Sequence, residues 1–419
     1  MTHDITKKVK TINEKTMIAA IDIGKTVHYG YLRAPNGTEV KPFAFHNGHK
    51  SFEDFWAKIC VFKEAQQLED IVIGFESSGP YAEPLFHFLL KKPVTLVQVN
   101  PLHTKRLKEL TGNSPNKTDQ KDPRVIADVI ALGHALTLVV PQGPAAELRR
   151  LTQARERAIK HRTMLVNRLQ QLIFMIFPEF LTVIKQVTSK TAQYLLQHYP
   201  TPQHIITLGI EPLTTLLKKI SRGKYRQHHA QNLFTAAHHS GGVREGMHST
   251  VQEIQHLITI IAQENTFIDR IEKQLCCYLQ QIPYSHSLLS LKGIGVITVA
   301  GLIGEVGDFG KFSTIAELMK LAGLDLFEIS SGRHQGQRHI SKRGRPLIRK
   351  LLFFAAINAV RRTGIMHVPY KRMCERGMPK LKALIAIARK LLRIIFALAR
   401  NNTTYVENYC AHHTVKQAA

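Results

Sequence analysis

The sequence predicts an α/β domain followed by a mainly helical region. Short apolar strands alternate with helical stretches over residues 17–137. Two long helices with a seven-residue apolar repeat follow within residues 145–283, and basic helices occupy residues 284–400. A polar leader (1–16) and a polar tail (401–419) flank these domains.

The chain carries a large positive charge. Its 57 lysines and arginines outnumber 31 acids, which gives a formal net charge of +26. Such an excess indicates a polyanionic partner, nucleic acid first and an anionic membrane second. The most apolar stretch, residues 383–399, contains three cations and is no membrane span. With no signal-peptide pattern and no disulfide or metal spacing among five cysteines, we expect a cytoplasmic protein.

Apolar runs predict the strands of the first domain, and longer amphipathic stretches predict its helices. Basic side chains, including Lys105 and Arg106, follow the last strand in a segment that we expect to be a loop holding a nucleic-acid backbone. Strands are expected over residues 17–24, 27–32, 40–45, 71–76 and 94–99, helices over 51–67 and 81–90, and the loop over 100–116.

Acidic residues in this domain suggest a metal site. Asp22 and Glu76 lie near the ends of apolar strands, where a carboxylate is costly unless it is compensated. Asp119 and Asp122 are three residues apart and share one face if a helix begins there, with Lys117 suited to phosphate. Four converging carboxylates need a cation, and their oxygens suit Mg2+. The alternative is that these acids only cap loops or favour a helix N-terminus.

The two long helices carry different charges. In the first, Leu151, Ala158, Leu165 and Leu172 recur every seven residues, which is typical of a coiled coil. Cations dominate its second seam, so we expect Arg155 and Arg162 to face nucleic acid. The second helix repeats Ile254, Ile261, Ile268 and Leu275, and the pair predicts an antiparallel hairpin or a seam for a second protomer. Residues 180–245 are expected to form helical pieces.

The C-terminal domain contains two phosphate-binding candidates. Residues 288–301 read as helix, Gly-x-Gly turn and helix, where Lys292, Gly293 and Gly295 can clamp a DNA backbone; an ordinary helical hairpin is the alternative. A glycine-rich loop over residues 321–336 and the basic stretch after it precede helices at 346–362 and 379–399. A serine in that loop is either a nucleophile on phosphate or a turn residue. The candidates are the serines Ser330 and Ser331 and the cations Arg333, Lys342, Arg343 and Arg345.

Short motifs lie along nearly the whole chain. The N-terminal ones are Ile21-Asp-Ile-Gly24, Phe75-Glu-Ser-Ser-Gly-Pro-Tyr81, Val99-Asn-Pro101 and Lys117-Thr-Asp-x2-Asp122; the C-terminal ones are Ala322-Gly-Leu324, Ser331-Gly332 and Ile340-Ser-Lys-Arg-Gly344. In this order they resemble the motifs of the DEDD transposases of insertion sequences, the IS110 family, which includes the Piv-type DNA invertases. Pro123 stands where the family usually has alanine, and proline is tolerated in a first helical turn.

The resemblance implies a RuvC-like, RNase H-type fold for residues 17–137, a coiled-coil linker, and a helical transposase domain. It implies that Asp22, Glu76, Asp119 and Asp122 hold Mg2+ and that Ser331, or else Ser330, attacks DNA. It also implies a guide, the element-encoded bridge RNA, which pairs with donor and target double-stranded DNA.

Because the two long helices invite pairing, we expect a homo-oligomer, a dimer or tetramer. We expect it in a prokaryotic cytoplasm near the nucleoid. Two alternatives stay open. One is a Holliday-junction endonuclease whose acids activate water, and the other is a non-catalytic nucleic-acid-binding protein.

Overall fold

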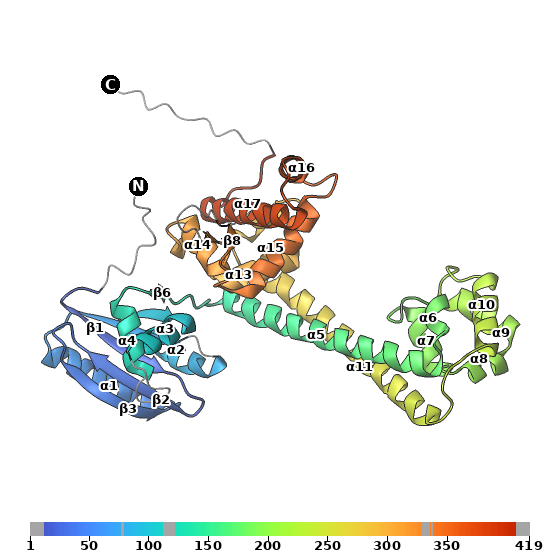
Figure 1. Ribbon diagram of the computed structural model, residues 1–419, viewed down its shortest axis with the longest axis horizontal. Helices are drawn as coiled ribbons and strands as arrows, with labels where there is room; N and C mark the ends of the chain where they lie inside the picture. Colours follow the sequence, from blue (N-terminus) through green and yellow to red (C-terminus); the bar gives the residue numbers. More distant parts are fainter. Residues whose placement is uncertain (1–11, 77–78, 112–121, 329–335, 337, 408–419) are drawn as a thin grey trace, which may run out of the picture. The chain divides into compact units, whose positions relative to one another are not determined.

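The computed structural model describes residues 12–76, 79–111, 122–328, 336 and 338–407. The chain divides into two compact units, Met1–Val140 and Pro141–Ala419. The first is a mixed α/β unit and the second is mostly helical, which confirms this part of the predicted fold class (Figure 1).

The N-terminal unit is built on a six-stranded sheet with the order β3-β2-β1-β4-β5-β6. The three central apolar strands run parallel, and the other three are antiparallel to their neighbours. The strands are β1 (Thr16–Asp22), β2 (Val27–Arg33), β3 (Glu39–His46), β4 (Asp70–Glu76), β5 (Thr95–Val99) and β6 (Ala135–Thr137).

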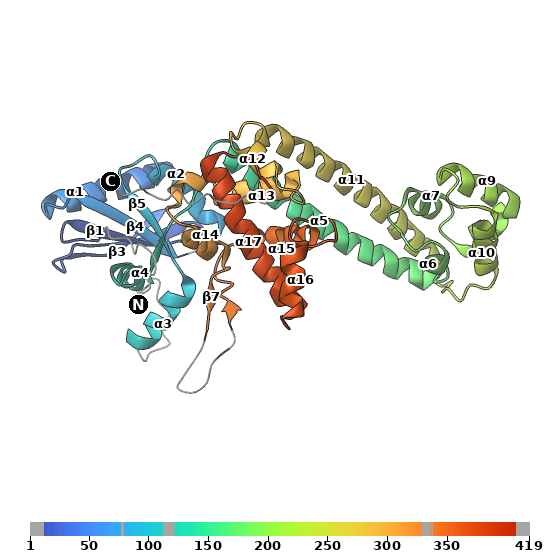
Figure 2. The same cartoon turned by 90° about the horizontal axis from the view of Figure 1, so that it is seen from above.

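Helices cover both faces of this sheet (Figure 2). Successive strand residues point to opposite faces, so Met17, Ala19 and Ile21 of β1 pack under α1 and α2, whereas Ile18 and Ala20 face α4. The helices on the first face are α1 (His49–Ala65) and α2 (Glu83–Leu89), which follows the short η1 (Pro80–Ala82); those on the second are α3 (Pro101–Thr111) and α4 (Asp122–Ala131).

The five predicted strands and two predicted helices of this unit are confirmed, with boundaries shifted by at most two residues. The loop predicted over residues 100–116 is wrong, because residues 101–111 form α3. Asn100 Oδ1 accepts a hydrogen bond from the Leu102 N–H at 2.9 Å, and Pro101 occupies the first helical position. Both are features of a helix start. The short β6 was not predicted.

Two long antiparallel helices, α5 (Pro144–Ile176) and α11 (Met247–Leu279), form the main axis of the second unit (Figure 1). Their direction follows from cross-pairs in which residue numbers rise on one helix as they fall on the other, such as Arg155–Glu272 and Arg168–Glu253. The predicted antiparallel hairpin is therefore confirmed. The seven-residue repeat of α11 is buried: Ile254, Ile261, Ile268 and Leu275.

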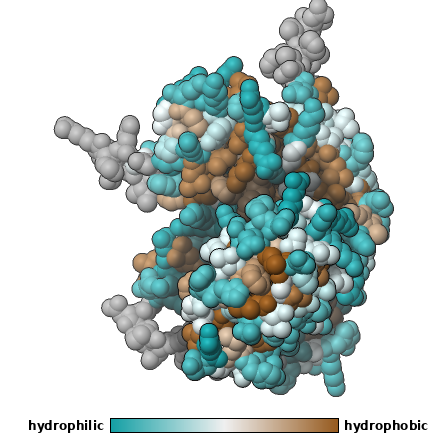
Figure 3. All heavy atoms as spheres, turned by 90° about the vertical axis from the view of Figure 1, so that its right-hand side faces the viewer, coloured by the Kyte–Doolittle hydropathy of each residue, from teal (hydrophilic) through white to brown (hydrophobic). Residues whose placement is uncertain are grey.

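Five short helices between α5 and α11 share one hydrophobic core with the facing ends of those helices. Figure 3 views this part end-on and shows mostly hydrophilic side chains around smaller hydrophobic areas. The sequence predicts helical pieces over residues 180–245 but not where each helix begins and ends. They are α6 (Phe180–Val183), α7 (Lys190–His198), α8 (Pro202–Leu208), α9 (Ile210–Ile220) and α10 (Gln227–His238).

The remaining helices pack on one another and on α5. Gly304 of α13 lies so close to α5 that a Cβ there would come within 2.6 Å of the Arg149 backbone nitrogen. The elements are α12 (Ser285–Leu289), α13 (Val296–Val306), η2 (Phe309–Lys311), α14 (Ile315–Ala322), β7 (Leu326–Phe327), β8 (His339–Ile340), α15 (Pro346–Ala359), α16 (His367–Glu375) and α17 (Lys380–Asn401). Within the described ranges, no helix is both long and apolar enough to cross a membrane.

Candidate active site

Asp22 and Glu76 lie side by side at the carboxyl ends of two parallel strands. The register pairs Ile21 of β1 with Phe75 of β4, so the next residue on each strand is one of the two acids. Alternation along both strands turns the two acids toward the face that α4 covers. The structure therefore brings together these two predicted site residues, both half-buried.

Thr104 of α3 contacts the carboxylate of Glu76. Its Oγ1 lies 2.9 Å from Glu76 Oε2 and 2.9 Å from the carbonyl oxygen of Pro101. The threonine is 2% exposed, so this hydroxyl lies in the protein interior. The sequence analysis missed Thr104, since only its place one turn inside α3 directs it toward Glu76.

Asp122 is the first residue of α4, and its carboxylate pairs with Lys108 of α3. Lys108 Nζ lies 2.5 Å from Asp122 Oδ1, and the side chains are 35% and 16% exposed, respectively. Lys108 belongs to the basic segment that is predicted to hold a nucleic-acid backbone, but its ion pair with Asp122 was not predicted. A lysine one turn after Thr104 could have indicated it, had residues 101–111 been recognised as a helix.

Ion pairs to two strands hold α4 on the sheet. Arg33 of β2 donates to Asp128 at 2.6 Å, and Arg124 donates to Glu39 of β3 at 2.6 Å. The Tyr31 hydroxyl also donates to Glu39. Burial, assisted by this hydrogen bond, raises the pKa of Tyr31 to about 12. These contacts fix the helix that begins with Asp122.

Among the described residues, only some of the predicted metal ligands lie close together. Two adjacent carboxylates, Asp22 and Glu76, offer the oxygen ligands that Mg2+ prefers. No group of three or more histidine, cysteine, aspartate or glutamate side chains gathers to hold a metal within the described ranges. Asp122 is instead paired with Lys108. Asp119, Lys117, Ser330, Ser331 and Arg333 lie outside the described residues.

The predicted nucleic-acid contacts differ in exposure. Lys105 and Arg106 are exposed on α3, and Lys342 and Arg343 are exposed just after β8. Lys292 is 74% exposed, with Glu407 at 3.5 Å. Gly293 and Gly295 are also exposed: Gly293 takes a positive φ of 93°, and Gly295 immediately precedes α13. The predicted order of helix, Gly-x-Gly turn and helix is confirmed, and the backbone clamp stays a prediction.

Two cations of α5 do not face outward as predicted. Arg155 Nε donates to Glu272 at 2.7 Å, and Arg162 Nη1 donates to Asn265 Oδ1 at 2.8 Å. Both partners belong to α11, so these guanidinium groups lie in the helix–helix seam. Arg157 and Lys160 are exposed on α5 instead.

Arg345 also lies elsewhere than predicted. It is paired with the 4% exposed Glu305 of α13, at 3.5 Å between Nη1 and Oε2. Burial, with Arg149 nearby, lowers the pKa of Arg345 to about 10. Arg149 Nε lies 4.0 Å from Glu305 Oε1, and Gln153 donates to the same oxygen at 3.3 Å. This buried cluster joins α5, α13 and the start of α15, and it leaves Arg345 little surface for nucleic acid.

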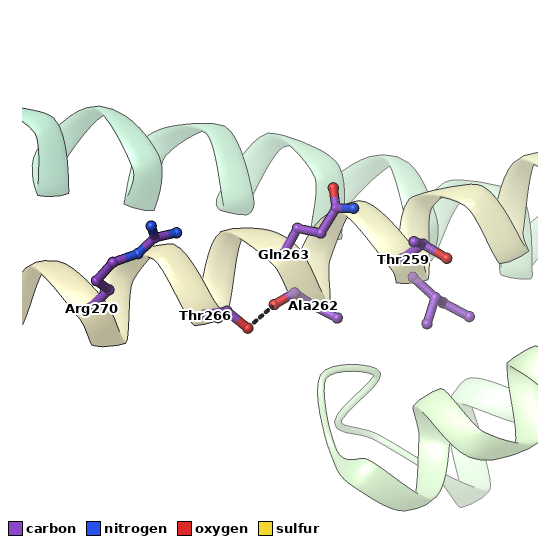
Figure 4. Close-up of a pocket in the computed structure, with 6 residues that line it drawn as sticks. Thr259, Ala262, Gln263, Thr266 and Arg270 are labelled. Carbon is purple, nitrogen blue, oxygen red and sulfur yellow. Dashed lines mark hydrogen bonds between the residues drawn. The ribbon is translucent and has the colours of Figure 1, made fainter.

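An open hollow of about 510 Å³ follows one face of α11 (Figure 4). Thr266 donates to the carbonyl oxygen of Ala262 at 3.0 Å, so its hydroxyl serves the helix backbone. Arg270 is the single charged residue of the lining, and none is acidic. The lining of the hollow therefore offers no carboxylate, histidine or cysteine ligand for a metal. It is lined by Ile258, Thr259, Ala262, Gln263, Thr266 and Arg270.

Comparisons with known proteins identify two family regions. Residues 19–178 match a transposase family of the DEDD, IS110 type, and residues 285–371 match the family described as Transposase IS116/IS110/IS902. The first contains Asp22, Glu76 and Asp122, and the second contains the loop with the two candidate serines.

Relatives from insertion elements match along most of the chain. An uncharacterized 43.6 kDa protein of insertion element IS110 from Streptomyces coelicolor is 26% identical over 389 residues, 92% of this chain and 94% of the relative. An uncharacterized 44.8 kDa protein of IS116 from Streptomyces clavuligerus is 24% identical, with 92% and 95% covered. A 42 kDa protein of IS900 from Mycobacterium paratuberculosis is 27% identical, with 69% and 73% covered. With both transposase regions present in one chain, the protein belongs to the IS110 family of insertion-sequence transposases.

Proposed function

We propose that this transposase excises and inserts an insertion sequence by Mg2+-dependent attack of a serine on the DNA backbone. The observation that carries the proposal is the pairing of Asp22 and Glu76 at the carboxyl ends of β1 and β4, inside the DEDD family region. Transposases of the DEDD type typically use a divalent metal. We assign a RuvC-like catalytic fold to residues 17–137 on the same basis.

The proposed metal ligands are Asp22, Glu76, Asp119 and Asp122. A Mg2+ ion bound there supplies positive charge to a phosphodiester under attack. The carboxylates of β1 and β4 would hold such an ion at one edge of the sheet, because parallel pairing sets the spacing of the two strands. The ion pairs of α4 with β2 and β3 fix the helix that brings Asp122.

Ser331, or else Ser330, is the proposed nucleophile. Its Oγ forms a bond to phosphorus as the bond from phosphorus to the leaving deoxyribose oxygen breaks, and the leaving oxygen takes up a proton. The product is a phosphoserine link, and a DNA hydroxyl reverses the step during strand exchange. One ester replaces another at each stage, so no ATP is needed.

The basic surfaces are the proposed binding sites for double-stranded DNA and for an element-encoded bridge RNA. The net charge of +26 supports a polyanionic partner, and exposed cations at Lys105, Arg106, Lys342 and Arg343 offer phosphate contacts. We further propose a homo-oligomer, in which one protomer supplies the acids and another the serine.

An adduct assay tests the proposal. The full chain, Mg2+, DNA spanning the element's ends and RNA transcribed from its flanking non-coding stretch are incubated, denatured and examined for protein bound covalently to DNA. We expect an adduct that disappears in Ser331→Ala and in Asp22→Asn and that weakens without the RNA.

Other outcomes separate the alternatives. Cleavage without an adduct would identify a water-using nuclease, and an adduct lost in Ser330→Ala alone would move the nucleophile by one residue. Undiminished DNA binding with neither cleavage nor adduct would identify a binding protein. Mixing a Ser331→Ala protomer with an Asp22→Asn protomer tests the shared site, since partial rescue is expected only if the two groups act in trans.

A further inference from the structure

One face of helix α3 contacts two carboxylates of the proposed site. Thr104 and Lys108 are four residues apart, so they project from the same side of the helix, one turn from each other. Thr104 contacts Glu76 of β4, and Lys108 contacts Asp122 of α4. This helix therefore connects a strand ligand with a helix ligand that are 46 residues apart in the chain.

We propose that α3 tunes metal binding: Thr104 positions Glu76, and Lys108 competes with the divalent cation for Asp122. The proposal rests on the proposed function, in which these carboxylates bind a divalent cation. Neither residue is among the acids that the family's name describes.

Thr104 limits the orientations that Glu76 can adopt. Its hydroxyl is buried and lies within hydrogen-bond distance of Glu76 Oε2 and of the Pro101 carbonyl, so the threonine is itself held by its own helix. The contact at Oε2 thus restricts how the carboxylate can turn toward a cation. Groups that orient metal ligands in this way contribute roughly 10-fold to 100-fold to metal affinity.

Lys108 acts in the opposite direction. Its ammonium group and a divalent cation carry charge of the same sign, so both cannot lie at the Asp122 carboxylate without repulsion. The lysine side chain is 35% exposed and long, which allows the ammonium to turn outward when a cation binds. There it joins the exposed Lys105 and Arg106 of the same helix, where a DNA phosphate is the complementary partner.

The test is Mn2+ binding to the full chain without DNA or RNA, measured by electron paramagnetic resonance of free Mn2+ and by calorimetry. Lys108→Met is expected to raise Mn2+ affinity by roughly fivefold, because a competing charge is removed. Thr104→Val is expected to lower it by roughly 10-fold, whereas Thr104→Ser, which keeps the hydroxyl, holds it near the wild-type value. A tighter site cannot result from damage to the fold.

Lys91→Met is the charge-matched control, since Lys91 is an exposed lysine of the same unit, and its Mn2+ affinity should not change. Asp22→Asn and Glu76→Gln test the proposed function itself. If Mn2+ does not bind, or binds equally well to these two variants, the carboxylate site is wrong. If these variants lose Mn2+ while Lys108→Met and Thr104→Val match wild type, the site stands and the role of α3 is overturned.

Discussion

Gly74 of β4 lies directly under Ile130 of α4. A Cβ at Gly74 would come within 2.2 Å of Ile130 Cδ1 and 2.9 Å of Val97 Cγ2. The missing side chain is what allows α4, and with it Asp122, to lie flat on the strand that ends in Glu76. The spacing between Asp122 and Glu76, two of the proposed metal ligands, thus depends on one glycine.

Gly74→Ala is expected to destabilise the N-terminal unit by roughly 1–3 kcal/mol, because Ile130 is fully buried and must move. Trp56 is the only tryptophan and lies in α1 of this unit, so its fluorescence during urea unfolding reports the change. Gly48→Ala is the control, since a Cβ there meets nothing within 4 Å. Equal stability of the two variants would contradict the close packing of α4.

Glu305→Ala is expected to destabilise the C-terminal unit by about 3–5 kcal/mol, because it leaves Arg345 buried beside Arg149 without a carboxylate. Hydrogen exchange of α13 and α15, followed by mass spectrometry, measures the loss where it occurs. The surface pair Lys371–Glu375 supplies the control: Glu375→Ala should change stability by less than about 1 kcal/mol.

Adding Arg345→Met to Glu305→Ala should recover part of this stability, since one uncompensated cation is removed. A double variant as unstable as the sum of the two single variants would show that the two residues do not interact.

Arg155 and Arg157 are predicted to separate stability from nucleic-acid binding. Arg155→Ala removes the partner of Glu272 and should lower the melting temperature with little effect on binding. Arg157→Ala removes an exposed cation and should weaken DNA or RNA binding, lowering the slope of log affinity against log salt by about one. Filter binding across a salt series and thermal unfolding measure both. If Arg155→Ala instead weakened binding and Arg157→Ala lowered the melting temperature, Arg155 would be the residue that contacts nucleic acid.

Tyr31 gives the N-terminal unit a predicted alkaline sensitivity. Its folded pKa of about 12 lies above the ordinary value of 10.0, so the unfolded chain releases this proton first as pH rises. The stabilisation is complete below pH 10 and is lost as pH rises toward 12. At pH 11 the loss is on the order of 1 kcal/mol.

Tyr31→Phe should therefore show a flatter stability profile between pH 9 and pH 11, measured by urea unfolding with Trp56 fluorescence. An equally steep decline in the variant would assign the sensitivity to another group.

Local pattern was enough to predict the sheet and its two paired acids. Each strand of the parallel core is an apolar run, and an acid at its end stands out against that background, as Asp22 and Glu76 do. Helix α3 was missed because its apolar residues are sparse and its cations resemble a basic loop. The three-residue β6 has no pattern of its own and depends on pairing with β5.

The partners of charged residues could not be read from the sequence. Arg155 and Glu272 are 117 residues apart, and their meeting depends on how α5 and α11 align. The basic stretch around Arg345 looked like a single surface, yet burial against Glu305 takes this one guanidinium inside. The partners of Thr104 and Lys108 likewise become known only once β4 and α4 are packed against α3.

The N-terminal unit comes first in the chain and is therefore translated first. Every strand of the six-stranded sheet, and both of its helical layers, precede Val140, so this unit has all its parts while the ribosome is still translating the rest. At ordinary rates of synthesis the remainder takes on the order of tens of seconds. Asp22, Glu76 and Asp122 are thus translated well before Ser330 and Ser331, and the proposed chemistry waits for the last third of the chain.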